Sequence, residues 1–220
     1  MRRFRNTSSA GSGFTIPEVV IAVALLVLLL SSAILAASGG LGAFRATQLD
    51  VDLESRGRRA LDRVALELLC TGTSELQPDP TGQFGAGARN LPLLFRPAAG
   101  LNGTAVVWGD QNQLAFEDEP GEVNDGLDND GNGLIDDGML VLTRDMGGNE
   151  KRVVLCHGVR ELLEGEDANG ADDNGNGVTD EAGFNVHRVG DVLFLRLSLE
   201  EAGEQGNVVR TLETSVRLRN

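Results

Sequence analysis

Residues 13 to 18 read Gly-Phe-Thr-Ile-Pro-Glu, and the 19 residues that follow, Val19 to Ala37, carry no charged side chain. An apolar run of this length falls within the range of about 17 to 25 residues that a helix needs to cross a bilayer. Arg2, Arg3 and Arg5 precede the run. Because positively charged flanks stay in the cytoplasm, we expect a single-pass protein of the cytoplasmic membrane, with its N-terminus inside and its head outside, in the periplasm or the extracellular space.

Two common kinds of apolar segment fit this stretch only in part. A secretory signal has a shorter apolar region of about 7 to 15 residues that ends at small residues, and Ala36, Ala37 and Ser38 would have to serve as its cleavage site. A plain single-pass anchor explains the length. Neither explains Glu18, because a lone acid at the edge of a membrane span is costly unless it has a partner.

The segment resembles the leader and cleavage motif of type IV prepilins and type II secretion pseudopilins, with a basic leader, Gly13-Phe14, Glu18 and an apolar run in the expected order. The resemblance implies that a prepilin peptidase cuts after Gly13, that Phe14 becomes the N-methylated first residue, and that the hydrophobic helix is kept. It also implies that Glu18 neutralises the Phe14 amine of a neighbouring subunit during assembly. Pro17 departs from the family's usual aliphatic residue, but Pro is acceptable in a first helical turn.

Beyond Gly39-Gly40 the helical pattern becomes amphipathic, with one apolar stripe and a charged back. The stripe consists of Ala46, Leu49, Leu53, Ala60, Leu61, Val64, Leu68 and Leu69. We expect one helix that runs to about Leu69 and ends near Cys70-Thr71-Gly72. Residues 61–69 and 215–220 also resemble J-type and W-type minor pilins.

The remainder predicts a β-rich head, so the fold class is α+β, a long helix on an antiparallel sheet. Residues 77–103 are rich in Gly and Pro and predict a loop with a short strand at 93–95. Further strands are expected at 104–108, 113–117, 139–144, 152–156 and 193–199, the last forming a hairpin with 208–218. The predicted parts are a leader (1–13), a membrane or filament-core helix (14–38), an amphipathic helix (39–72) and the head (73–220).

The chain has a formal net charge of -14, and -14 - 3 = -17 once the three leader arginines are removed. Such an acidic protein repels phosphate backbones, so no nucleic-acid partner is expected. The sequence shows no Ser-His-Asp, phosphate-loop or Cys-x-x-Cys pattern, and an enzyme is not expected.

Two acidic stretches, within residues 124–138 and 167–183, resemble each other 44 positions apart. Both fit the first nine positions of a calcium loop, with oxygen side chains at positions 1, 3 and 5, Gly at 6, a backbone carbonyl at 7 and Asp at 9. Position 12 lacks a carboxylate and no helices flank the loops, so neither is a complete EF-hand. The predicted ligands are Asp128, Asp130, Asn132, Leu134, Asp136 and Asp137 in the first loop, and Asp172, Asn174, Asn176, Val178, Asp180 and Glu181 in the second.

Calcium is the cofactor that this pattern predicts, and flexible Asn/Asp/Gly turns are the alternative. The second loop has Asn174 where the first has Asp130, so it is expected to bind more weakly. The two cysteines, Cys70 and Cys156, permit either one disulfide or two free thiols, because pairing cannot be derived from their positions alone.

The sequence therefore predicts a minor pilin or pseudopilin, a structural subunit whose partners are the prepilin peptidase, other pilins or pseudopilins and the cytoplasmic membrane. Two alternatives remain: an anchored calcium-dependent adhesin or binding module, and an anchored hydrolase that uses the acidic loops as its metal site. The sequence does not distinguish a pilus from a secretion system.

Overall fold

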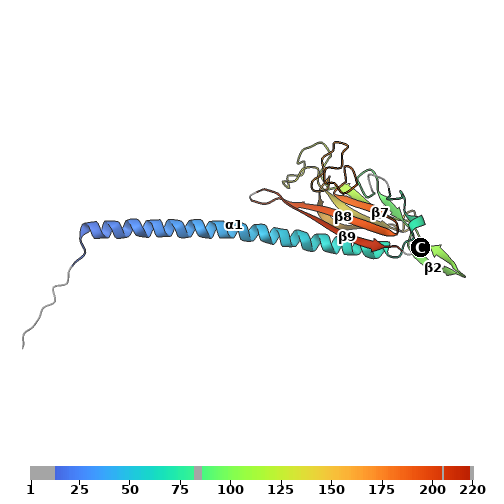
Figure 1. Ribbon diagram of the computed structural model, residues 1–220, viewed down its shortest axis with the longest axis horizontal. Helices are drawn as coiled ribbons and strands as arrows, with labels where there is room; N and C mark the ends of the chain where they lie inside the picture. Colours follow the sequence, from blue (N-terminus) through green and yellow to red (C-terminus); the bar gives the residue numbers. More distant parts are fainter. Residues whose placement is uncertain (1–12, 82–85, 205, 219–220) are drawn as a thin grey trace, which may run out of the picture. The chain divides into compact units, whose positions relative to one another are not determined.

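The computed structural model describes residues 13–81, 86–204 and 206–218. The chain forms two compact units, Met1–Arg45 and Ala46–Asn220. A single helix, α1 (Ile16–Leu68), passes through both units (Figure 1). This confirms the predicted continuous helix and, to within one residue, its end. Apart from Gly13, the predicted leader lies outside the described residues.

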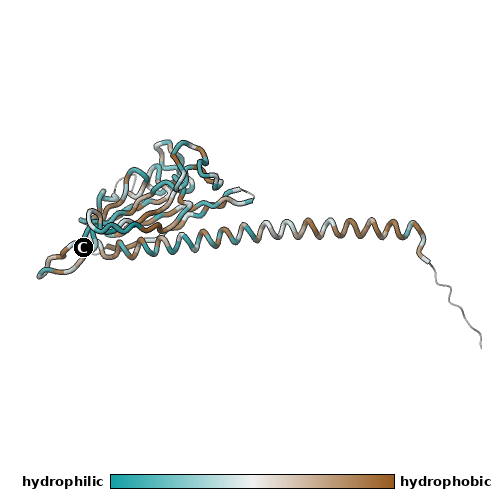
Figure 2. Tube along the Cα trace, turned by 180° about the vertical axis from the view of Figure 1, so that it is seen from behind, coloured by the Kyte–Doolittle hydropathy of each residue, from teal (hydrophilic) through white to brown (hydrophobic). Residues whose placement is uncertain are grey.

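In the first unit, α1 is long and apolar enough to cross a membrane. Its large apolar side chains between Ile16 and Leu35 are 50–81% exposed. Figure 2 shows the change along α1 from uniformly hydrophobic residues to a mixed pattern that includes many hydrophilic ones. An apolar surface on every side of a helix is typical of a segment that lies in lipid or among other helices.

In the second unit, the amphipathic part of α1 packs on the sheet with the predicted stripe. Five stripe residues are buried in the core, namely Leu53, Ala60, Leu61, Val64 and Leu68. Ala46 and Leu69 are both exposed, so their inclusion in the stripe was wrong, and Leu49 is half-buried. Ion pairs join the helix to the sheet at both ends of the packed segment, through Asp50–Arg210, Arg56–Glu201 and Glu67–Arg144.

The head is built around a seven-stranded antiparallel sheet with the order β1-β4-β5-β6-β8-β7, in which β9 pairs with β8. β7 and β9 both pair with residues 192–197 of β8, so they lie on its two opposite edges. β6 pairs with β8 at one position, Val159 with Leu199. The strands are β1 (Leu93–Phe95), β4 (Asn112–Asp118), β5 (Gly138–Arg144), β6 (Lys151–Val159), β7 (Phe184–Val189), β8 (Val192–Glu201) and β9 (Val208–Arg217).

The sheet curls toward a barrel, which was not predicted. Ala86 pairs with Val186 of β7, and the neighbouring Gly87 carbonyl accepts the N–H of Phe116 in β4 at 3.2 Å. The segment at residues 86–87 thus links two strands that the main ladder keeps apart. The long apolar helix and the antiparallel sheet confirm the α+β class, while the curl is a feature of the head for which the sequence analysis had no signal.

Two strands lie where none was predicted. β2 (Ala98–Asn102) falls in the segment predicted to be a loop and forms a separate hairpin with β3 (Ala105–Trp108). Its residues are all exposed, so no burial pattern marked it as a strand. A short 3-10 helix, η1 (Thr73–Glu75), follows α1. The second strand that was not predicted is β7, which pairs with β8. The predicted hairpin of β8 and β9 is confirmed.

Both cysteines are free thiols, so the structure lacks the disulfide that their even number allowed. Cys70 follows the end of α1 and is exposed, whereas Cys156 is buried in β6. Burial raises the pKa of the Cys156 thiol to about 12. Cys156 therefore belongs to the apolar core rather than to a cross-link.

Candidate metal sites in two acidic loops

The two acidic loops resemble each other over a longer stretch than the calcium-loop pattern covers. Residues 122–137 and 166–181 align without a gap at the same offset of 44 and have identical residues at seven positions, including Glu122 and Glu166 at their starts. Both segments lack His and Cys. Their donor atoms are therefore all oxygens, which suit a hard cation such as calcium better than a soft metal.

The first loop folds around the side chain of Asp128. Its two carboxylate oxygens accept the backbone N–H groups of Gly131 at 2.7 Å and Gly133 at 3.0 Å. The side-chain oxygen of Asn132 accepts the N–H of Leu134 at 2.7 Å. The side-chain oxygens of Asp128 and Asn132, four residues apart, thus hold the backbone in successive turns, with their remaining lone pairs available to a ligand.

The second loop repeats this geometry. Asp172 accepts the N–H groups of Gly175 at 2.7 Å and Gly177 at 2.8 Å. Asn176 accepts the N–H of Val178 at 2.9 Å. Two segments of different sequence therefore adopt one loop structure, which is more than the flexible-turn alternative requires.

Each loop is attached to the head by the apolar residue that follows its bend. Leu134 and Val178 are buried, and the preceding Gly133 and Gly177 both have φ of 90°. A side chain at that φ would be strained, so glycine is required for the sharp bend that turns the chain back toward the core.

The predicted ligands at position 9 of each loop serve a different purpose in the structure. Asp136 accepts the backbone N–H groups of Asp125 and Gly126, each at 2.9 Å. Asp180 accepts the N–H of Gly170 at 3.0 Å in the same way. Both aspartates have left-handed backbones, with φ of 52° and 46°. They close each loop onto its own start, and their role as metal ligands stays a prediction.

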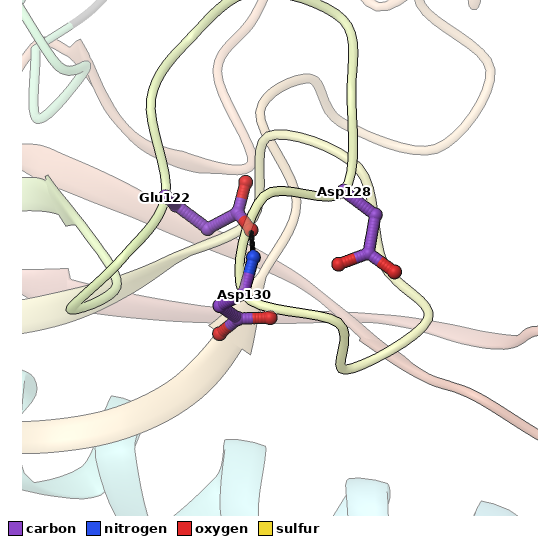
Figure 3. A group of neighbouring side chains, drawn as sticks. All are labelled: Glu122, Asp128 and Asp130. Atoms are coloured by element: carbon purple, nitrogen blue, oxygen red, sulfur yellow. Dashed lines mark hydrogen bonds between the residues drawn. The ribbon is translucent and has the colours of Figure 1, made fainter.

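A residue outside the predicted set joins the first loop. The carboxylates of Glu122, Asp128 and Asp130 offer oxygens that lie within 4.8 Å of one another, as Figure 3 illustrates. Glu122 is 7% exposed, and its Oε1 accepts the N–H groups of Asn129 and Asp130 at 2.8 Å each. Its Oε2 is buried without a hydrogen-bond partner.

Glu166 resembles Glu122 in burial and in its unpartnered oxygen, although it accepts one backbone N–H group rather than two. It is 6% exposed, its Oε1 accepts the N–H of Asn174 at 3.0 Å, and its Oε2 is also buried without a partner. Each glutamate lies six residues before the aspartate at position 1 of its calcium-loop pattern, Asp128 or Asp172. The sequence analysis missed both because the calcium-loop pattern begins at that aspartate, although the repeat itself continued upstream.

The loops differ in how their last carboxylate is balanced. Glu181 is fully buried, receives the Asn174 and Asn176 amides, and pairs with Arg196 of β8 at 2.6 Å. Its counterpart Asp137 is 2% exposed, and no ion pair in the described ranges includes it. The last carboxylate of the second loop is therefore paired with a cation from β8, whereas Asp137 has no ion pair among the described residues, although Arg89 donates to the neighbouring Asp136 carbonyl at 3.3 Å.

The electrostatics of Asp137 reflect this difference. Burial raises the pKa of Asp137 to about 6, against the opposing hydrogen bond from Asn132, and the nearby carboxylates of Glu119, Asp130 and Glu122 raise it further. A cation in the loop would relieve both effects, since it would compensate the charge that burial and repulsion disfavour.

The predicted processing site lies at the start of α1. Gly13 and Phe14 precede the helix, and Phe14 is 87% exposed. Glu18 Oε2 accepts hydrogen bonds from the backbone N–H and the hydroxyl of Thr15, both at 2.8 Å. Thr15 and Glu18 thus form part of a capping box, a pattern of Thr and Glu three residues apart that the sequence analysis did not use.

No family model, curated protein or solved structure matches this chain.

Proposed function

We propose that this protein is a membrane-anchored structural subunit of a type IV pilus-like or type II secretion filament. The observation that carries the proposal is the division of one helix into two parts. The first part is predominantly apolar and exposed, with a single acid, Glu18, and the second part packs on a sheet. A plain anchor needs neither the acid nor a helix that continues into the head. A filament subunit uses both, because its apolar helix packs among those of its neighbours.

The chemistry of assembly follows from the cost of charge in lipid. Cleavage after Gly13 would create a positively charged amine on Phe14, next to the apolar helix. The carboxylate of Glu18 on one subunit and the amine of the next are each expensive in hydrocarbon and become tolerable as a pair. Before assembly, the Thr15 hydrogen bonds satisfy the Glu18 carboxylate within its own chain.

A second component of the proposal concerns the head. Calcium bound in the two acidic loops would order long insertions whose carboxylates otherwise repel each other. At a free concentration about 100 times the dissociation constant, a site stabilises the fold by roughly 2.7 kcal/mol. The same loops favour the alternative of an anchored calcium-dependent binding module. That alternative requires calcium binding but does not require incorporation into a filament.

Variants of Glu18 test the filament role. Glu18→Gln keeps a capping side chain but removes the charge, whereas Glu18→Ala removes both. We expect both variants to reduce co-isolation with other prepilin-type subunits from cells at least about tenfold, because leaving a buried amine unpaired costs more than 1.4 kcal/mol. Glu54→Gln, a loss of charge on the exposed back of the same helix, is the control.

Each result has a separate meaning. Co-isolation of Glu18→Gln at the level of the unchanged protein would reject the charge-pair role. If the unchanged protein itself did not co-isolate with such subunits, the filament proposal would fail and the binding module would be favoured.

A further inference from the structure

We infer that Glu122 and Glu166 are metal ligands, and that each completes an oxygen site for calcium together with the aspartate at position 1 of its loop pattern, Asp128 or Asp172. The inference rests on the proposed calcium binding and extends it to two residues that precede the calcium-loop pattern. The supporting observation occurs at the same position of both loops: Glu122 Oε2 and Glu166 Oε2 are buried carboxylate oxygens without a hydrogen-bond partner.

Such an oxygen is unusual in a folded protein. Buried polar atoms nearly always have a partner, and a buried charge without one is strongly disfavoured. The ion pairs of the described residues include neither Glu122 nor Glu166. A structural carboxylate would be expected to have an arginine or lysine nearby, as Glu181 has Arg196. A bound cation would satisfy the same need.

The two loops hold these glutamates in position for such a role. One oxygen of Glu122 accepts the N–H groups of Asn129 and Asp130 at 2.8 Å each, and one oxygen of Glu166 accepts the N–H of Asn174 at 3.0 Å. This fixes the carboxylate beside the loop and leaves its second oxygen uncommitted. In the first loop the Glu122 carboxylate lies with those of Asp128 and Asp130 (Figure 3).

The glutamates also answer the main objection to the calcium pattern. In an EF-hand, the carboxylate at position 12 provides two oxygens, and both loops lack it. A glutamate from the upstream side supplies a carboxylate that the downstream side does not. The occurrence of the glutamate, its unpartnered oxygen and the aspartate in both loops argues that these features belong to one site.

Calorimetric titration of calcium into the full chain in detergent, after removal of metal with a chelator, tests the inference. We expect the unchanged protein to bind at two sites. Glu122→Gln and Glu166→Gln should each weaken one site by about tenfold or more, since even indirect supports of a metal site have effects of that size. The double variant should lose both. Glu164→Gln, an exposed charge loss two residues from Glu166, should leave both sites unchanged.

Melting curves separate a ligand from a structural residue. Glutamine retains an oxygen that can accept the loop N–H groups, so in chelator each variant should melt no lower than the unchanged protein. In calcium each should show a smaller increase in Tm. A variant that melts lower by the same amount in both conditions would mean that its glutamate is structural, and this would overturn the inference.

The remaining outcomes are also distinguishable. Calcium binding by the unchanged protein together with unaltered binding by both variants would overturn the ligand role alone. Absence of calcium binding by the unchanged protein would reject both the inference and the calcium component of the proposed function, while the filament role would still be decided by the Glu18 variants.

Discussion

At the scale of single residues, burial gives chemically identical side chains different properties, and the two cysteines are the simplest example. Cys156 is 5% exposed within the core, and burial raises its pKa to about 12. Cys70 is exposed beyond the end of α1. Because the thiolate is the reactive form, Cys156 should be inert at neutral pH in the folded protein while Cys70 should react.

Counting thiols checks this prediction. We expect a thiol reagent at about pH 8 to modify one cysteine per chain in the folded protein in detergent and two after denaturation. Cys70→Ser should abolish the reaction of the folded protein. If no thiol reacted in the denatured, unreduced protein, the two cysteines would form the disulfide that the structure lacks.

The sequence located most of the candidate metal site at this scale, but not all of it. The spacing of Asp128, Gly133 and Leu134 follows a local rule, so the turn, the positive φ and the buried anchor could all be predicted. The orphaned oxygen of Glu122 could not be predicted, because it depends on how the chain covers that side chain. The pairing of Glu181 with Arg196 depends on strand register and was also beyond a local pattern.

At the scale of elements, the packing of α1 on the sheet depends on a close approach at Gly57. A Cβ at this position would lie 2.5 Å from Leu212 Cδ1 and 3.2 Å from Leu199 Cδ1. Gly in a helix costs about 1 kcal/mol relative to Ala, so its presence here indicates that the contact needs the space. The helix crosses the β8–β9 hairpin at this point.

Substitutions at Gly57 should separate helix propensity from packing. Gly57→Ala should change the free energy of unfolding little, because the gain in propensity offsets a shift of the flexible Leu212 side chain. Gly57→Val should cost about 1–3 kcal/mol through overpacking. Chemical denaturation of the full chain in detergent, followed by the fluorescence of the single Trp108, measures both. The control Ser55→Val, at an exposed position of α1, should stay within about 0.5 kcal/mol, and an equal loss in it would refute the packing role.

The elements that the sequence analysis predicted are those with a strong periodic burial. Leu193, Leu195, Leu197 and Leu199 alternate along β8 and are all fully buried. In β7, by contrast, the polar Asn185 is buried between Phe184 and Val186, so alternation is lost. The exposed β2 has no alternation to detect. Strands that depend on pairing rather than on burial of one face leave little trace in a single sequence.

At the scale of the whole molecule, the chain combines a helix long and apolar enough to cross a membrane with a head that carries most of the acidic charge. The net charge of -14 would oppose compaction where acids crowd, and the acidic loops concentrate it. In our account, calcium offsets this repulsion in the head and the Glu18 carboxylate offsets the new amine in the anchor. In both cases the opposite charge comes from outside the chain: a calcium ion for the loop carboxylates, and the Glu18 carboxylate of a neighbouring subunit for the Phe14 amine.

The most direct test of the account is the N-terminus of the protein extracted from membranes. Intact mass and N-terminal sequencing should show a chain that begins at methylated Phe14, having lost Met1–Gly13 and kept the apolar helix. A chain that still begins at Met1 would be an ordinary anchored protein. A chain that begins after the small residues near Ser38 would have lost the apolar segment as a secretory signal. Either of these last two results would contradict the filament role.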